Sequence, residues 1–286
     1  MRIALLALAA AAAGAMLVTS SSNAALPASF TETVNVPGAG SLYRGIFPSA
    51  TAPQPLRPGY VYLPPGFSPT ARYPVVYLLH GLPGSPGEYV DALGFRRVAD
   101  ALVASGDVRP FIAVIPAAGP SVTYNGEWAG PWERYLVDDV VPWVDGHLPT
   151  EATRSGRVLA GLSAGGFGAA DIGVRQPQVF GTIESWSGYF HALHDGPFKD
   201  APSTVLAAND PALLVAEKAT RLRTLGTRFF VGSGPSHSHW FKEQESVDFA
   251  RELERLGVRH TLVLTADKER QYSLQLTAGL VWALRP

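Results

Sequence analysis

Short apolar runs alternate with amphipathic stretches along most of the chain. Between residues 27 and 75, turns rich in Pro and Gly separate the runs, which predicts antiparallel strands at a sheet edge. After Pro74 the runs are continuous and rich in β-branched residues, as strands covered on both faces require. The amphipathic stretches between them predict crossover helices and a parallel sheet. The predicted strands are 33–36, 60–63, 75–79, 111–115, 158–160, 182–186, 228–231 and 261–264. The predicted helices are 89–105, 135–148, 164–175, 242–256 and 272–284.

The first 24 residues have a different character. Met1 and Arg2 precede an almost uncharged run, 3–18, and a small-x-small site follows near Ala24. This pattern predicts a secretory signal peptide, 1–24, and a secreted or extracytoplasmic protein of the cell envelope. The alternative is an uncleaved anchor, but the run is shorter than the ~20 residues that span a bilayer as a helix. We therefore expect no stable membrane insertion after cleavage and one α/β domain, 25–286.

Composition removes several classes of function. The chain has 286 residues, of which 47% are hydrophobic, so it can build a sizeable core. Its 23 Lys and Arg residues against 24 Asp and Glu residues leave a net charge of -1, which excludes a basic field for nucleic acid. Cysteine is absent from the sequence, so thiol nucleophiles and thiolate zinc sites are excluded. Any nucleophile must use oxygen or nitrogen.

One serine is a candidate nucleophile. Gly161 to Gly165 form a G-x-S-x-G motif, which is a weak signal alone. Here it directly follows a predicted strand and directly precedes a predicted helix. A sharp turn at this place exposes the Ser163 hydroxyl at the carboxyl edge of the sheet and directs the helix N-terminus toward it. The alternative is a Gly-rich turn that serves packing alone.

A second loop is suited to support such a serine. The residues from His80 to Gly84 follow the buried strand 75–79. Acyl transfer develops negative charge on a carbonyl oxygen, which two preorganised backbone N–H groups can stabilise. The N–H groups of Leu82 and Ala164 are the candidates. We expect His80 to fix this loop rather than to act as a base.

Five segments resemble one known family. They are 73–81, 133–145, 161–166, 175–181 and 185–188. With them the chain resembles the α/β-hydrolase superfamily, in particular the putative-esterase branch that includes esterase D, feruloyl and acetylxylan esterases and secreted mycolyltransferases. The resemblance implies a mostly parallel central sheet with helices on both faces. It also implies a serine carboxylic ester hydrolase or acyltransferase that needs no cofactor and acts on a small-molecule, glycan or lipid ester.

The remaining catalytic positions depart from the family pattern. The family places its acid in the loop that here reads 232–240, which contains no carboxylate, and its histidine in the turn that here reads 265–270, which contains no histidine. One hypothesis is a rearranged triad in which His239 or His237 is the base. In that triad Asp267 or Asp195 is the acid.

Two further hypotheses remain open at this stage. The protein is an inactive binding protein for a cell-envelope glycolipid, polysaccharide or protein partner, or the two histidines are only structural. A metal site built from His191, His194 and Asp195 together with His237 and His239 is a weak alternative because no spacing matches a zinc pattern, so we expect no metal. Trp128 is interpreted either as the roof of a substrate site or as a packed loop anchor.

Overall fold

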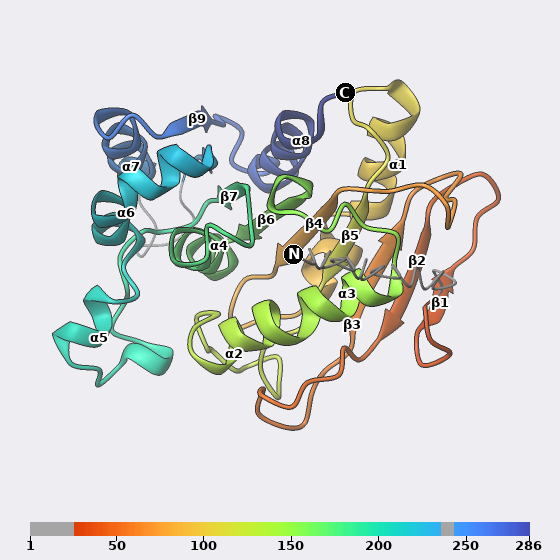
Figure 1. Ribbon diagram of the computed structural model, residues 1–286, viewed down its shortest axis with the longest axis horizontal. Helices are drawn as coiled ribbons and strands as arrows, with labels where there is room; N and C mark the ends of the chain where they lie inside the picture. Colours follow the sequence, from red (N-terminus) through yellow and green to blue (C-terminus); the bar gives the residue numbers. More distant parts are fainter. Residues whose placement is uncertain (1–25, 236–242) are drawn as a thin grey trace, which may run out of the picture.

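A single nine-stranded sheet organises the chain (Figure 1). The computed structural model describes residues 26–235 and 243–286. The strand order is β1-β2-β3-β5-β4-β6-β7-β8-β9, with antiparallel pairing from β1 to β5 and parallel pairing from β5 to β9. The strands are β1 (Thr31–Val34), β2 (Ser41–Gly45), β3 (Gly59–Leu63), β4 (Val75–Leu79), β5 (Ile112–Ile115), β6 (Arg157–Leu162), β7 (Thr182–Trp186), β8 (Arg228–Ser233) and β9 (Arg259–Leu264).

Helices cover both faces of this sheet, as the sequence predicts. α1 and α8 pack with one set of alternating strand residues, and α3, α4, α6 and α7 pack with the other set. The α-helices are α1 (Phe95–Ser105), α2 (Pro131–Arg134), α3 (Val141–His147), α4 (Ala164–Arg175), α5 (Ser203–Ala207), α6 (Pro211–Leu225), α7 (Glu243–Arg255) and α8 (Gln271–Leu284). Short π and 3-10 segments are η1 (Glu88–Ala92), η2 (Tyr135–Val140), η3 (Arg154–Gly156) and η4 (Gly196–Phe198).

Several elements differ from the prediction. β2 and α6 were not predicted, and β1 begins two residues earlier than the predicted strand 33–36. The predicted helix 89–105 is divided at Gly94, which takes the left-handed conformation with φ +59°. The predicted helix 135–148 instead starts at Pro131 and passes through a π-helical segment. Apart from α6, which is an entire crossover helix between β7 and β8, the differences lie at an edge or a boundary, and the predicted central parallel strands are all present.

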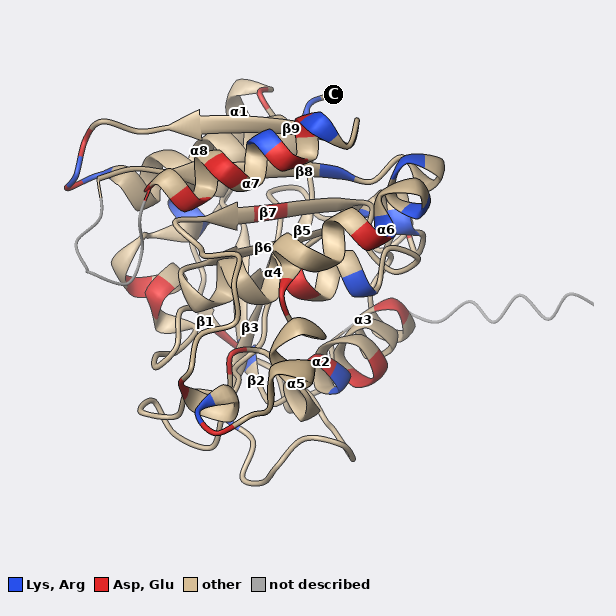
Figure 2. Ribbon diagram, turned by 90° about the vertical axis from the view of Figure 1, so that its left-hand side faces the viewer, with Lys and Arg blue, Asp and Glu red and all other residues tan. Residues whose placement is uncertain are grey.

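Charged side chains are interspersed on the outer helices. α7 carries both acidic and basic residues, as Figure 2 shows, and two of its arginines pair with acidic residues three positions earlier. This arrangement agrees with the near-zero net charge. Within the described residues, no helix combines the length and the apolar character needed to cross a membrane.

One carboxyl group lies inside the sheet layer. Glu184 on β7 is 1% exposed, and its Oε2 accepts a hydrogen bond of 3.1 Å from the indole Nε1 of Trp186. α8 crosses so closely that a Cβ on Gly279 would lie 2.1 Å from Oε2. Burial raises the pKa of Glu184 to about 8, although the Trp186 hydrogen bond and Arg228 oppose the shift. Glu184 is therefore mostly protonated in the folded protein at neutral pH.

Replacement of this buried acid is expected to change how stability depends on pH. Because the folded-state pKa of Glu184 lies above its ordinary value of 4.5, the folded protein binds the proton more tightly than the unfolded chain does. Stability therefore falls as pH rises from about 5 to 8, by as much as ~1.4 kcal/mol per pH unit from this group. Urea unfolding from pH 5 to 9 should show a flatter profile for Glu184→Gln. The exposed control Glu254→Gln should keep the wild-type slope, and an unchanged slope in Glu184→Gln would contradict the assignment.

Candidate active site

Ser163 lies in a strained turn between β6 and α4. Its backbone has φ +56° and ψ -122°, a region that non-glycine residues rarely adopt. The Ser163 N–H donates to the Trp186 carbonyl at 3.0 Å, and the Ser163 carbonyl accepts from the Phe167 N–H at 3.0 Å. The side chain is only half-buried, although the residues of α4 that follow it are buried. The turn therefore presents Ser163 at the carboxyl edge of the sheet and at the N-terminus of α4.

Two glycines allow this turn to pack. A Cβ on Gly161 would lie 2.0 Å from the Gly165 carbonyl oxygen, and a Cβ on Gly165 would lie 1.9 Å from the Leu79 carbonyl oxygen. Both obstructing atoms belong to the backbone, so a rotamer change cannot relieve either contact. The glycines of the motif are thus required by the close approach of α4 to β4 and to its own turn.

The loop after β4 lies directly beside Ser163. A Cβ built on Gly81 would be 3.6 Å from the Ser163 Cβ. His80 is fully buried, and its Nε2 accepts a hydrogen bond from the Ala118 N–H at 3.2 Å. Its Nδ1 therefore carries the proton and donates to the Gly81 carbonyl at 2.7 Å. Burial lowers the pKa of His80 to about 4, so this residue is a neutral group that fixes the loop.

Glu88 on η1 provides a second support for the same loop, and the sequence analysis did not single it out. The Gly81 N–H donates to its Oε2 at 2.6 Å, and burial raises its pKa. With His80 holding the Gly81 carbonyl and Glu88 holding its N–H, the peptide groups before Leu82 have fixed orientations. In the sequence, Glu88 and Asp91 are two acidic residues that follow a Gly/Pro-rich loop, which is a weak signal.

The two predicted oxyanion donors line one common cavity. Leu82 and Ala164 both contribute to a cavity of about 530 Å³. Ala164 is the first residue of α4, so its N–H has no carbonyl partner within the helix. These positions are compatible with two N–H groups that stabilise an oxyanion next to Ser163. Their role in catalysis remains a prediction.

The predicted base and acid are not brought together by the described residues. His239 and His237 lie outside the described residues. Asp267 lies in the turn between β9 and α8, where its carboxylate accepts hydrogen bonds of 3.0 Å from the backbone N–H groups of Glu269 and Arg270. It also pairs with the Arg270 guanidinium at 3.0 Å, and it is exposed. Its visible contacts therefore serve the start of α8, and its role as the acid remains a prediction.

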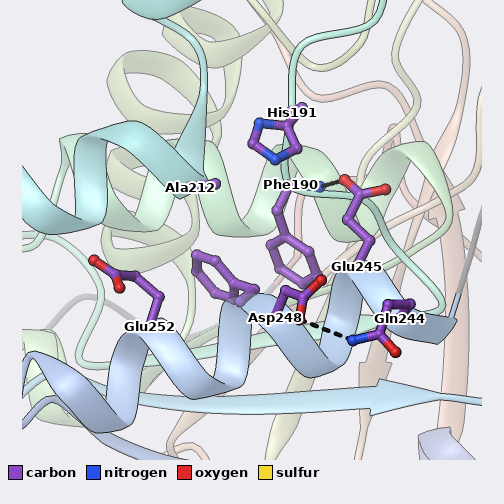
Figure 3. Close-up of a pocket in the computed structure, with 8 residues that line it drawn as sticks. Phe190, His191, Ala212, Gln244, Glu245, Asp248 and Glu252 are labelled. Atoms are coloured by element: carbon purple, nitrogen blue, oxygen red, sulfur yellow. Dashed lines mark hydrogen bonds between the residues drawn. The ribbon is translucent and has the colours of Figure 1, made fainter.

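Of the candidate metal residues that the structure describes, His194 and Asp195 line the cavity beside Leu82, whereas His191 lines another cavity. His191 pairs with Asp210 at 3.0 Å, whereas Asp195 accepts from the Asn125 side chain at 3.3 Å. Figure 3 shows His191 at one end of a separate cavity of about 310 Å³, in which Glu245 accepts from the Phe190 N–H at 2.6 Å. Within residues 26–235 and 243–286, no three His, Asp or Glu side chains form a group that could hold a metal ion.

Trp128 is a packed loop anchor rather than a roof. It is fully buried, its Nε1 donates to the His80 carbonyl at 3.0 Å, and its ring meets the His80 ring edge to face. Trp128 and its neighbour Glu127 both have positive φ, at +53° and +49°. The buried indole therefore fixes this unusual turn. Glu127, the other residue of the turn with positive φ, lines the cavity together with Leu82.

Comparisons with known proteins agree with this geometry. Residues 51–279 match the family model described as "Putative esterase". An endo-1,4-beta-xylanase/feruloyl esterase of Xylanibacter ruminicola is 34% identical over 131 residues, which is 42% of this chain and 18% of that protein. An esterase of Mycobacterium tuberculosis is 25% identical over 235 residues, 70% of this chain and 49% of that protein. The chain thus spans about half or less of the length of these curated relatives.

Solved structures confirm the fold. A ferulic acid esterase superposes with a TM-score of 0.76 at 22% identity, covering 86% of this chain and 98% of its own. An S-formylglutathione hydrolase from Agrobacterium tumefaciens superposes with a TM-score of 0.67 at 18% identity, covering 87% and 96%. The predicted α/β-hydrolase fold of the esterase branch is therefore confirmed.

Proposed function

The chain belongs to the putative esterase family, and on this premise we propose that it cleaves or transfers the acyl group of a carboxylic ester with Ser163 as its nucleophile. The observation that carries this proposal is the backbone of Ser163. A non-glycine residue is held at φ +56° between β6 and α4, with its side chain against the Gly81 loop. Strain of this kind is maintained where it positions a reacting group.

The reaction follows from the placement of these groups. The Ser163 Oγ attacks the ester carbonyl carbon, and the electron pair of the C=O bond moves onto its oxygen. The N–H groups of Leu82 and Ala164, together with the positive end of α4, stabilise that oxyanion. Its collapse re-forms the C=O bond and breaks the bond to the alcohol oxygen, which receives the proton that the base took from Ser163, and an acyl group remains on Ser163. Water then releases the acid in a hydrolase, whereas an acceptor alcohol takes the acyl group in an acyltransferase.

A base must remove the Ser163 proton, and we assign this role to His239, with His237 as the alternative. Support comes from the sheet order. β8 ends at Ser233, on the same edge as Ser163, and the Ser187 N–H after β7 donates to the Gly232 carbonyl at 2.8 Å. The segment that contains His239 thus follows a strand two places from β6. Asp267, at the end of the adjacent β9, or Asp195 would orient the imidazole.

The substrate is proposed to be a small-molecule ester. Proteins similar to this chain are named feruloyl or ferulic acid esterases, which makes a feruloyl ester the first acyl donor to test. A glycan or lipid as the alcohol part belongs to the same proposal. No step requires a cofactor, because each is polar chemistry of serine, imidazole and backbone N–H groups. We also propose that residues 1–24 direct secretion, so that the protein acts in the cell envelope or outside the cell.

Covalent labelling tests this proposal directly. The native protein should react with a fluorophosphonate probe, and peptide mass spectrometry should place the adduct on Ser163, because the probe needs an activated serine and an oxyanion site. Ser163→Ala should remain unlabelled, and heat-denatured wild type serves as the second control. A folded wild type that resists the probe, while a known serine hydrolase in the same tube reacts, would exclude the enzyme and favour the non-catalytic binding protein.

A further inference from the structure

The cavity that adjoins Leu82 and Ala164 has one polar end. Its apolar walls come from Leu82, Pro83, Ala164, Ala192 and Leu193. Asn125, Glu127, Tyr189, His194 and Asp195 supply the polar part. A volume of about 530 Å³ falls within the range of small-molecule sites, which are mostly apolar and carry a few placed polar groups. Any substrate whose carbonyl oxygen reaches the Leu82 and Ala164 N–H groups must place a substituent in or beside this cavity.

The polar end is built around a buried carboxyl group. Glu127 is 2% exposed, and the Tyr189 hydroxyl, itself 1% exposed, donates to its Oε2. The Glu127 N–H donates to the Asn125 side-chain oxygen at 3.2 Å. The carboxyl group of Asp195 lines the same cavity and is exposed at its rim. Asn125 donates to the Asp195 Oδ2 at 3.3 Å, so both carboxyl groups are held in place.

The Glu127 carboxyl group is partly protonated at neutral pH. Burial raises the pKa of Glu127 to about 7, and the Asp195 charge acts in the same direction against the Tyr189 and Asn125 hydrogen bonds. Burial also raises the pKa of Asp195. The carboxyl oxygens of Glu127 and Asp195 have lone pairs beyond those used by the Tyr189 and Asn125 donors, and these lone pairs can accept from a hydroxyl group. An apolar analogue without that hydroxyl would leave this end of the cavity without a hydrogen-bond donor.

We propose that this cavity is the specificity pocket of the ester substrate, and that the paired carboxyl groups of Glu127 and Asp195 recognise a hydroxyl group at the far end of an otherwise apolar substituent. The inference rests on the proposed function and names the chemistry of its substrate. The hydroxyl group belongs either to the acyl part or to the alcohol part of the ester. Apolar walls take up the body of the substituent in either case. Glu127 and Asp195 are the only acidic residues among the described residues that line the cavity.

Matched substrates test the pocket. Methyl 4-hydroxycinnamate and methyl cinnamate differ by one acyl-side hydroxyl group, and glyceryl monobutyrate and propyl butyrate differ by alcohol-side hydroxyl groups. Wild type should prefer the hydroxylated member of one pair by about tenfold or more in kcat/KM, the effect of one hydrogen bond of ordinary strength. The pair that shows the preference identifies the part of the ester that enters the pocket.

Variants show whether the carboxyl pair causes the preference. Asp195→Ala removes the rim partner and should bring the ratio of kcat/KM values close to one. Glu127→Gln replaces a protonated carboxyl group by an amide of the same shape and should keep most of the preference, whereas Glu127→Leu should abolish it. Asp200→Ala is the matched control, because Asp200 is exposed nearby and does not line the cavity. No preference in either pair, or a preference that survives in both Asp195→Ala and Glu127→Leu, overturns the proposal.

A binding measurement separates this result from failure of the enzyme hypothesis. Binding to Ser163→Ala is measured by calorimetric titration. If the acyl-side substrates showed the kinetic preference, 4-hydroxycinnamate should bind more tightly than cinnamate. If the alcohol-side substrates showed it, glycerol should bind more tightly than propanol. The difference should disappear with the additional change Asp195→Ala. If neither ester turnover nor probe labelling occurs, the proposed function fails, yet a difference lost on Asp195→Ala would still support the pocket. Equal binding within both pairs would refute the pocket, whatever the protein catalyses.

Discussion

Ser163→Ala is expected to lower kcat for p-nitrophenyl butyrate hydrolysis by at least about 10³-fold while the urea midpoint stays close to that of wild type. The hydroxyl oxygen is the only atom removed, and no atom of the protein can replace it in the covalent step. The residual rate reflects the oxyanion N–H groups and substrate binding, which survive the change. Alanine, like serine, is a non-glycine residue, so the substitution leaves the backbone strain at φ +56° unchanged. The turn should therefore keep its shape.

The structure offers a matched control for this substitution. Ser187 follows the neighbouring strand β7 and also has a positive φ, at +47°, while its hydroxyl donates to the Gln275 side chain at 3.1 Å. Ser187→Ala thus makes the same chemical change at a similarly strained turn and should retain activity within about tenfold. If Ser163→Ala kept the wild-type rate, or if the two variants lost activity equally, Ser163 would not be the nucleophile.

The candidate nucleophile could be predicted because its signals are local. A buried strand, the G-x-S-x-G motif with its two glycines, and a helix follow one another between Arg157 and Arg175. The central strands could be predicted for the same reason, since each is a continuous apolar run. α6 also has local signals that could have predicted it, namely Asp210 before its start, Pro211 in its first turn and Gly226 after its end. In the structure the Asp210 side chain accepts from the Leu213 N–H, as an N-cap does. β2 is only five residues long, has no regular alternation of polar and apolar residues and depends on pairing with β3.

The pocket could not be predicted because its contacts join distant parts of the chain. Tyr189 and Glu127 are 62 residues apart, and Asn125 and Asp195 are 70 apart. An isolated glutamate beside a tryptophan in a Gly-rich loop resembles many solvated acids. Only the fold shows that Trp128 is anchored beneath His80 and thereby places Glu127 in the cavity wall. The histidine and acid positions posed the same difficulty, because a departure from a family pattern does not show which distant side chain replaces the missing one.

Gly165→Ala is expected to damage both folding and catalysis, although it adds a single methyl group to a helix. Its Cβ would lie 1.9 Å from the Leu79 carbonyl oxygen and 2.9 Å from the His80 carbonyl oxygen, both of which are backbone atoms at the end of β4. α4 must therefore move away from β4, and overpacking of this kind costs about 3 kcal/mol or more where no side chain can yield. The same movement shifts Ser163 and the Ala164 N–H relative to Leu82. A displacement near 1 Å is enough to lower kcat by about 10²-fold.

Gly146→Ala separates this contact from the general effect of Ala in a helix. Gly146 lies within α3, and its added Cβ would have no atom within 4 Å. That variant should gain about 0.5 to 1 kcal/mol from helix propensity and keep full activity. Urea midpoints and p-nitrophenyl butyrate kinetics of both variants provide the comparison. A Gly165→Ala protein as stable and active as Gly146→Ala would mean that the turn at Ser163 does not depend on the backbone contact with β4. An active but destabilised Gly165→Ala protein would instead show that the contact serves folding alone and does not position the nucleophile.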